Sequence, residues 1–181
     1  MELSKTSYVV LGMLRLGRRT GYEIKTLVDI STRFFWAASY GQIYPELKRL
    51  EEAGLVNGTD DASDGRRRRA YELTDAGERA LHDWLTSDAA LSVELRHEGA
   101  LKLFFADALD PDEQLALIRA TRAVHEHARD ELRALHPEIE SEPDPDKRCP
   151  RRVLEWGIEL NDFYVDWCSR VERDLETERS G

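Results

Sequence analysis

The sequence of 181 residues lacks the features that mark secreted and membrane proteins. It has two cysteines, Cys149 and Cys168, and no CxxC pair, so no disulfide framework is expected. No apolar run approaches the roughly 18–20 residues that span a bilayer. The first ten residues lack the basic and apolar regions of a signal peptide. We therefore expect a reduced, cytoplasmic protein.

Motifs of common catalytic and cofactor sites are also missing. The sequence contains no GxSxG, HExxH, P-loop or GxGxxG pattern. His125 and His127 point to different faces of a helix at their spacing of two, so they do not form a metal-binding pair. His82, His97 and His136 show no ligand spacing with either cysteine. We expect no enzyme activity, no metal and no cofactor.

Positive charge is in deficit over the whole chain, with 26 Lys+Arg against 36 Asp+Glu and a net charge of −10. This balance argues against nucleic-acid binding, which depends on neutralising phosphates. The deficit is uneven, however. Residues 1–86 hold 13 basic and 13 acidic side chains, whereas residues 87–181 hold 13 and 23. The acidity lies in the second half and does not exclude a DNA-binding first half.

Residues 1–86 are expected to form three short helices, a hairpin and a fourth helix. The expected capping residues are Ser7, Thr20, Ser39 and Thr74. Ser39 and Gln42 have the spacing of a capping box, and Gly54 ends the helix that they open. Pro45 lies beyond the first turn of that helix, where proline removes a hydrogen bond. The sequence leaves open whether the helix begins nearer Gly41 or bends at the proline.

The expected hairpin spans residues 55–73. Its tip is rich in turn-forming residues, including Asn57-Gly58 and Asp64-Gly65. Four consecutive arginines, Arg66–Arg69, form its descending arm. Because neighbouring strand residues point to opposite faces, at most about half of these arginines can face one ligand from a regular strand.

The second half is expected to be entirely helical, with helices at 94–108, 111–135 and 151–176 and a proline-rich connector at 136–150. The last helix has two apolar stripes, and one neighbouring helix can cover only one of them. We infer that the other stripe meets a second copy of the chain. The residues assigned to this dimer interface are Trp156, Leu160, Phe163, Trp167 and Val171.

The order of elements in the first half is typical of a winged helix-turn-helix, whose recognition helix enters the DNA major groove. Its first residues meet base edges, while cations further along the helix and on the wing meet phosphates. The fold class is therefore mostly α: a winged helix-turn-helix at 1–86 and a helical dimerisation domain at 87–181. The candidate DNA-binding residues are Ser39, Tyr40, Gln42, Tyr44, Lys48, Arg49, Arg66, Arg67, Arg68 and Arg69.

Four segments carry a family resemblance: residues 11–14 (LGML), 21–24 (GYEI), 39–56 (SYGQIYPELKRLEEAGLV) and 69–77 (RAYELTDAG). They resemble the signature of PadR-type transcriptional regulators, and the helical second half is similar to the longer subgroup in length and layout. The resemblance implies a homodimeric repressor, and some members release DNA on binding a small aromatic molecule. The chain departs from the family pattern in its four adjacent arginines and in Glu46, which we expect to face away from phosphate.

Several interpretations stay open at this stage. Tyr44 suits either the core or base contact, and Lys48 and Arg49 suit either phosphate contact or pairing with the glutamates that follow them. The four tryptophans suit either core and dimer packing or an aromatic effector pocket. We expect a repressor that binds a pseudo-palindromic operator as a homodimer. The alternative is a winged-helix module that binds protein.

Overall fold

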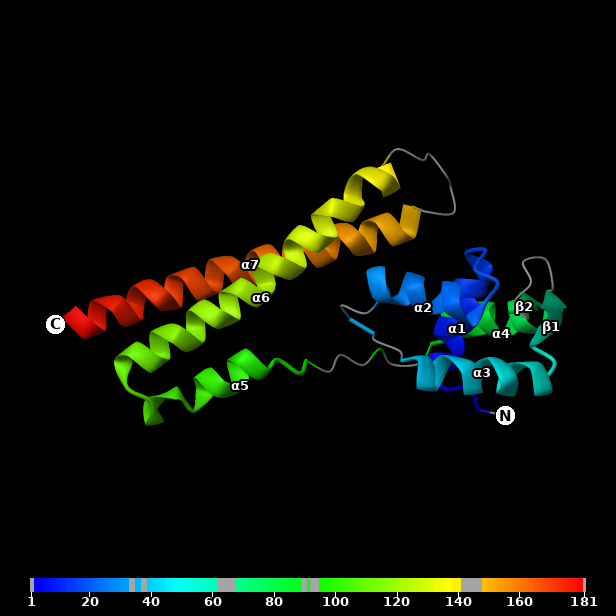
Figure 1. Cartoon of the computed structure of the whole chain (residues 1–181), viewed down its shortest axis with the longest axis horizontal. Coiled ribbons are helices and arrows are strands. Elements are labelled where there is room, and N and C mark those ends of the chain that lie inside the picture. The colour runs from blue at the N-terminus through cyan, green and yellow to red at the C-terminus, as the bar shows by residue number, and fades with distance from the viewer. Residues whose placement is uncertain are drawn as a thin grey trace. The chain divides into compact units, whose positions relative to one another are not determined.

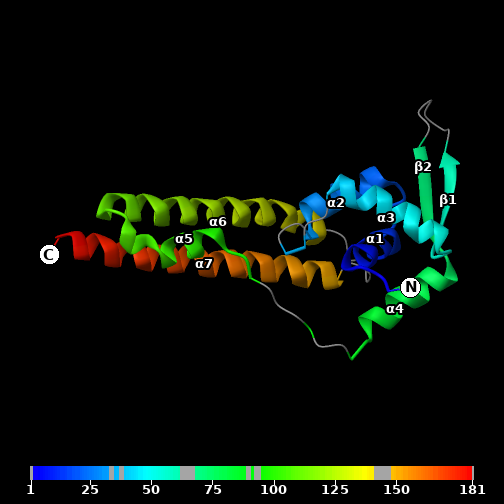
Figure 2. The ribbon, with the colours of Figure 1, turned by 90° about the horizontal axis from the view of Figure 1, so that it is seen from below.

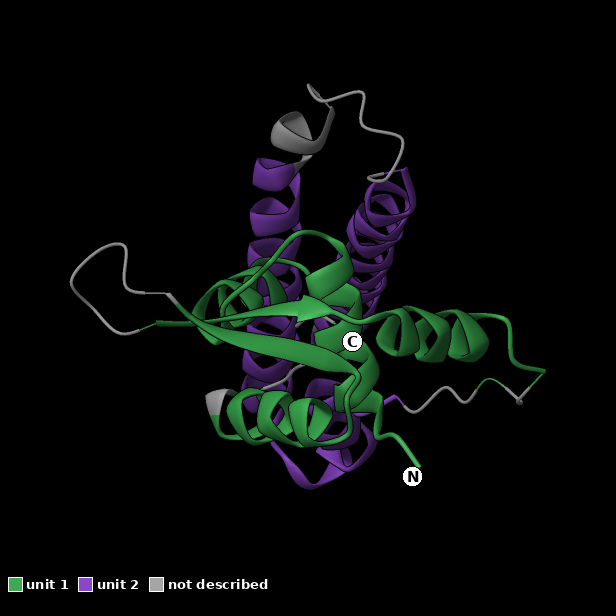
Figure 3. Cartoon of the chain, turned by 90° about the vertical axis from the view of Figure 1, so that its right-hand side faces the viewer, with its two compact units in different colours: residues 1–91 green, residues 92–181 purple. Residues whose placement is uncertain are grey.

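The computed structural model describes residues 2–32, 35–36, 39–61, 68–88, 91, 95–140 and 148–180. The chain divides into two compact units, residues 1–91 and 92–181 (Figures 1 and 3). The division falls at residue 91, a few residues after the boundary at 86 that the charge pattern suggests. Each unit is described by itself below.

Unit 1 contains the helices and the hairpin expected from the sequence. Its elements are α1 (Lys5–Arg15), α2 (Gly21–Ile30), α3 (Tyr40–Glu52), β1 (Val56–Asp61), β2 (Arg68–Leu73) and α4 (Asp75–Leu85). The cap of α1 is Ser4, so the assignment of Ser7 was wrong. Ser4 and Ser7 form a capping box in which each hydroxyl accepts from the other's backbone N–H, and the three-residue spacing puts Ser7 inside the first turn.

Helix α3 begins directly after Ser39, as the capping box predicts. The side-chain oxygen of Gln42 accepts a hydrogen bond of 2.9 Å from the Ser39 backbone N–H. The helix begins at Tyr40, directly before Gly41, and Pro45 lies within it. Gly54 follows the helix with a φ of 69°, a left-handed conformation that favours glycine.

One apolar core holds unit 1 together. Its buried side chains come from all four helices and both strands: Val10, Leu11, Met13, Leu14, Ile24, Val28, Ile43, Leu47, Leu50, Val56, Tyr71 and Leu81. At its edge, Trp84 of α4 stacks on Tyr8 of α1 with ring centroids 4.5 Å apart. This tryptophan therefore has the packing role that the sequence allowed for it.

The wing is the antiparallel pair β1–β2, with a register running from Val56 opposite Leu73 to Asp61 opposite Arg68 (Figure 2). Thr20, in the loop between α1 and α2, forms an isolated antiparallel β-bridge with Ala70 of β2. The first turn of α4 passes close to the backbone before β1. A Cβ on Gly77 would lie 2.1 Å from the Leu55 carbonyl oxygen, which explains glycine at this position.

Unit 2 contains α5 (Glu98–Phe104), a short 3-10 helix η2 (Ala106–Ala108), α6 (Pro111–Glu140) and α7 (Arg148–Ser180). Helices α6 and α7 lie side by side (Figures 1 and 2). Within the described ranges, no helix is both long and apolar enough to cross a membrane.

Both long helices extend beyond their expected ends, so the expected connector at 136–150 was drawn too long. Residues 136–140 belong to α6 and residues 148–150 to α7. Pro137 lies in the last turn of α6, and Pro150 lies in the first turn of α7, where the missing N–H has no helical partner to lose. The predicted single helix at 94–108 is also interrupted, at Phe105.

Helices α6 and α7 share a buried seam with ion pairs along its side. Leu115, Ile118 and Leu132 of α6 are buried, as are Leu154, Asn161 and Cys168 of α7. Arg119 and Arg122 of α6 both bond Glu172 of α7, and Arg133 bonds Asp162 at 2.9 Å. Burial raises the pKa of the Cys168 thiol, so this cysteine stays protonated and unreactive.

A hydrogen-bonded pair of histidines connects α5, α6 and α7. His97 Nδ1 accepts from the Ala100 backbone N–H at 2.9 Å. Its Nε2 must then carry the proton and donate to His125 Nε2, 2.8 Å away. His125 Nδ1 in turn donates to the side-chain oxygen of Asn161 at 2.9 Å, and Tyr164 stacks on His125. The arrangement uses both rings in their neutral form.

Candidate nucleic-acid interface

Helix α3 buries one face and presents the other to solvent. Ile43, Leu47 and Leu50 are fully buried in the core of unit 1. Gln42, Tyr44 and Lys48 lie on the exposed side. The helix is thus firmly anchored while offering a polar face, which is the arrangement a recognition helix requires.

The start of α3 carries the residues predicted to meet base edges. The Gln42 side-chain oxygen is occupied by the cap at Ser39, where it accepts from both the backbone N–H and the hydroxyl. Within the part of the chain that the structure describes, the Gln42 amide nitrogen makes no hydrogen bond and is available as a donor. Tyr40 begins the helix, and its side chain lies outside the described residues.

Tyr44 has features of both interpretations that the sequence left open. Its side chain is 49% exposed, so it is not a core residue. Its ring nevertheless covers the start of α2, since a Cβ on Gly21 would lie 2.7 Å from the Tyr44 ring. Because Gly21 has no side chain, the Tyr44 ring packs against the start of α2 while part of the ring stays exposed to solvent.

The two cations that follow on α3 have different surroundings. Lys48 is exposed and lies 3.7 Å from Glu52 at the i,i+4 spacing. Arg49 instead turns inward, where its Nη2 donates to Glu46 at 2.7 Å and to the Ser7 hydroxyl at 2.8 Å. The bond to Glu46 raises the pKa of Arg49 above its ordinary value. Glu46 faces α1, as expected for an acid that must avoid phosphate.

The wing arginines also differ from one another. Arg66 and Arg67 lie outside the described residues. Arg68 is exposed, and the structure gives it no hydrogen bond or ion pair among the described residues. Arg69 is bonded to Glu51 and Asp60 of its own chain. Sequence patterns missed this pairing because Glu51 lies 18 residues earlier.

The apolar stripe assigned to a dimer interface is open on α7. Phe163 is 57% exposed and Trp156 is 48% exposed, while Leu160, Trp167 and Val171 are partly exposed. In the other stripe, Leu154 and Cys168 are buried, whereas Ile158 and Val165 are partly exposed. The stripe assigned to the dimer interface is therefore the more exposed of the two.

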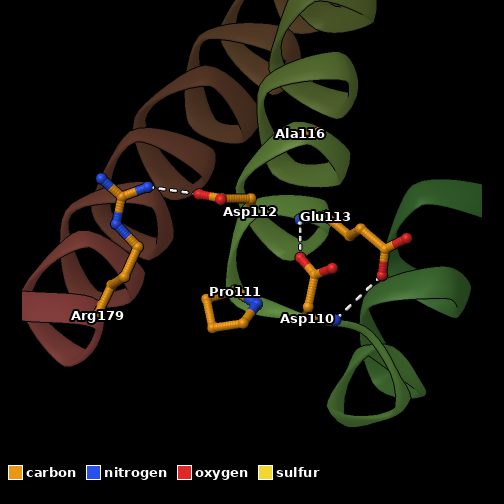
Figure 4. A pocket seen from close by; sticks show the side chains of 6 residues that line it. All are labelled: Asp110, Pro111, Asp112, Glu113, Ala116 and Arg179. Atoms are coloured by element: carbon orange, nitrogen blue, oxygen red, sulfur yellow. Dashed lines mark hydrogen bonds and ion pairs between the residues drawn. The ribbon is translucent and has the colours of Figure 1, made fainter.

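Two shallow hollows are formed by described residues of unit 2. The first lies at the start of α6 and is lined by acids, with Asp110 and Glu113 capping the helix and Asp112 paired with Arg179 (Figure 4). The second is lined by four apolar side chains, among them Leu101 and Phe105, and by Lys102. Among the described residues, no group of three His, Cys, Asp or Glu could hold a metal.

Comparison with known proteins decides the family. Residues 10–83 match the "Transcriptional regulator PadR-like family", and residues 95–176 match "Virulence activator alpha C-term". The "Negative transcriptional regulator PadR" of Bacillus subtilis (strain 168) is 30% identical over 170 residues, covering 91% of this chain and 93% of the relative. The chain belongs to the PadR-like family of transcriptional regulators.

Two solved structures extend the PadR-like assignment over nearly the whole chain. Bacillus subtilis PadR in complex with operator DNA matches with a TM-score of 0.87 at 25% identity, covering 97% of this chain and 99% of that one. The same protein with p-coumaric acid matches with a TM-score of 0.76 at 27% identity, covering 94% and 98%. The fold is a winged helix-turn-helix followed by a helical C-terminal domain, as the sequence predicts.

Proposed function

We propose that this chain is a homodimeric transcriptional repressor that binds a pseudo-palindromic operator. The observation that carries the proposal is the match along almost the entire chain to Bacillus subtilis PadR bound to operator DNA. The described surface of α3 supports it, because a capped, firmly packed helix presents polar side chains on its open face. The protein acts in the cytoplasm, where the operator is, and has no enzymatic role.

On this proposal the first turns of α3 read the DNA sequence. Ser39, Tyr40, Gln42 and Tyr44 enter the major groove, where the Gln42 amide N–H groups donate to acceptors on base edges. Lys48, one turn further on, contacts phosphate, and Arg66–Arg68 of the wing add phosphate contacts. These contacts to phosphate fix the register of the protein and supply most of the salt-dependent affinity.

The second copy covers the open stripe of α7. Val153 and Phe163 expose apolar area that a partner copy would remove from water. A two-fold dimer presents two recognition helices in opposite directions, so the operator consists of inverted half-sites about one helical turn apart or a small multiple of it.

A small aromatic molecule relieves repression in this scheme. The proposal rests on the solved structure of the Bacillus subtilis relative with p-coumaric acid. An effector of this kind favours the dimer form whose heads fit the operator poorly. Titrating p-coumaric acid into the protein–operator complex tests it, since release of DNA supports the role and unchanged binding removes this compound as effector.

The DNA-binding proposal is tested by measuring affinity for operator DNA against salt concentration. A phosphate-binding protein gives a steep negative slope of log K on log salt, with each phosphate contact contributing about 0.9. Arg68→Ala should reduce that slope, and Gln42→Ala should change the preferred sequence. Arg173→Ala, an equal loss of charge on exposed α7, is the control. A flat slope for the unmodified protein would favour the protein-binding alternative.

A further inference from the structure

We propose that Arg69 is not a phosphate contact but one half of a brace, completed by Glu51, that holds the wing at a fixed position relative to α3. The inference rests on the proposed DNA-binding function, because the brace matters through the contacts that the wing and α3 make together. It assigns a positioning role to Glu51, an acid at the end of the recognition helix.

The brace joins the two DNA-facing elements directly. Arg69 near the start of β2 directs its Nε to Oε2 of Glu51 at 3.3 Å, and its Nη2 bonds Oε1 of the same carboxylate. Two parallel bonds between a guanidinium and a carboxylate fix both distance and orientation. The third nitrogen, Nη1, bonds Asp60 across the hairpin at 2.9 Å. One side chain thus connects α3, β1 and β2.

The charges of this cluster argue against phosphate binding by Arg69. One guanidinium faces two carboxylates, so the cluster of Arg69, Glu51 and Asp60 carries one positive and two negative charges. A phosphate approaching Arg69 would meet two acids already bonded to all three guanidinium nitrogens. The adjacent Arg68 has no such pairing among the described residues and points to the other face of the strand.

The surrounding residues leave room for the brace and support it. A Cβ on Gly58 would lie 2.6 Å from both Arg69 Nε and Glu51 Oε1, so only glycine leaves this space open. The ring of Tyr71 lies beneath the guanidinium, 6.0 Å from its centre. Bonds from Arg69, followed by one from the Gly58 backbone, lower the pKa of Glu51, which keeps the carboxylate charged at neutral pH.

Replacing Glu51 distinguishes a brace from a phosphate contact, because the two roles predict opposite changes in operator affinity. With a brace, Glu51→Gln weakens operator binding by about fivefold or more and leaves the salt slope unchanged. If Arg69 is a phosphate contact, the same change removes a competing acid and strengthens operator binding. Asp88→Asn is the control, since it removes one exposed acid of unit 1 that pairs with neither Arg69 nor Lys48. Tighter binding for Glu51→Gln than for Asp88→Asn would overturn the proposal.

Two further variants test the brace with charge unchanged. Arg69→Lys keeps the positive charge but loses the two-point bond to the carboxylate, so it should bind operator as poorly as Arg69→Ala. Gly58→Ala displaces the bonded side chains and should weaken binding to a similar degree. Near-normal binding by both variants would reject the brace. Circular dichroism and thermal melting of each variant establish that the loss does not come from unfolding.

The two proposals fail in different ways. If the unmodified protein shows no salt-dependent binding to operator DNA, the proposed function fails and the brace has no role to play. If the unmodified protein binds steeply and Arg69→Ala reduces the slope by about 0.9, DNA binding stands and the brace is wrong.

Discussion

The buried hydroxyl of Ser7 on α1 donates a hydrogen bond to the carboxylate of Glu46 on α3. The same hydroxyl accepts from the backbone N–H of Ser4 at 2.9 Å and from Arg49 at 2.8 Å. A serine at the first turn of α1 therefore fixes the middle of the recognition helix. It also explains how Glu46, an unusual acid at this position, is tolerated beside a DNA-binding surface.

Replacing this serine should destabilise unit 1. Ser7→Ala leaves Glu46 without a neutral donor in a mostly buried site, and a hydrogen bond to a charged group contributes about 2 kcal/mol. We expect the free energy of unfolding from urea denaturation to fall by about that amount. Ser87→Ala, at an exposed site, is the control and should change stability little. Equal denaturation midpoints for both variants would show that the Ser7–Glu46 bond is unimportant.

Lys48 and Arg49 should behave differently although they are adjacent cations. Lys48 is 77% exposed, whereas Arg49 is held by Glu46 and Ser7. We expect Lys48→Ala to lower the salt slope of operator binding by about 0.9, as the loss of one phosphate contact does. Arg49→Ala should leave the slope unchanged and lower the melting temperature. If Arg49→Ala alone altered the salt slope, Arg49 and not Lys48 would be the phosphate contact.

The histidine pair predicts that unit 2 loses stability in mild acid. Burial, followed by the neighbouring His125, lowers the pKa of His97 from its ordinary value of 6.5. The unfolded state therefore binds a proton more readily than the folded state. The stability that neutral His97 contributes is complete above pH about 6.5 and is lost as pH falls below it. Thermal melting between pH about 7.5 and 5.5 should show this fall.

His97→Asn provides the test of that assignment, because asparagine can still cap α5 but does not titrate. The variant should show a flatter dependence of melting temperature on pH across the same range. His127→Asn, which alters an exposed histidine on the same α6 helix as His125, should keep the dependence of the unmodified protein. Identical pH profiles for His97→Asn and the unmodified protein would remove the histidine pair as the cause.

The open stripe of α7 predicts the effect of a charge at its centre. Phe163→Asp puts a carboxylate into the proposed dimer interface, and we expect the dissociation constant to rise about 100-fold, as for a strong interface residue. Sedimentation should then detect a monomer at concentrations where the unmodified protein is a dimer. Glu159→Ala, at an exposed charged position of α7, should leave the mass unchanged. A dimer that persists in Phe163→Asp places the interface elsewhere.

Local signals in the sequence predicted much of the fold. Ser39 and Gln42 lie three residues apart, and their capping box correctly placed the start of α3. The prediction of Ser7 as the cap of α1 was wrong, because Ser4, three residues earlier, is the capping residue. The helix was also predicted to end before Pro137, but α6 continues to Glu140 and Pro137 lies in its last turn.

Contacts between distant residues could not be predicted in this way. Ser7 and Glu46 are 39 residues apart, Glu51 and Arg69 are 18 apart, and His97 and His125 are 28 apart. Each pair meets only after helices or strands have packed, and no spacing rule relates its members. These contacts pair two of the candidate DNA-binding cations, Arg49 and Arg69, with acids of the same chain.

Selection of bound sequences from random double-stranded DNA tests the central claim most directly. A homodimeric repressor with one recognition helix in each copy predicts an enriched motif with two-fold symmetry, whose half-sites are separated by about one helical turn or a small multiple of it. Gln42→Ala should alter bases symmetrically in both half-sites. Enrichment of a single unsymmetrical motif, or no enrichment at all, would contradict the account.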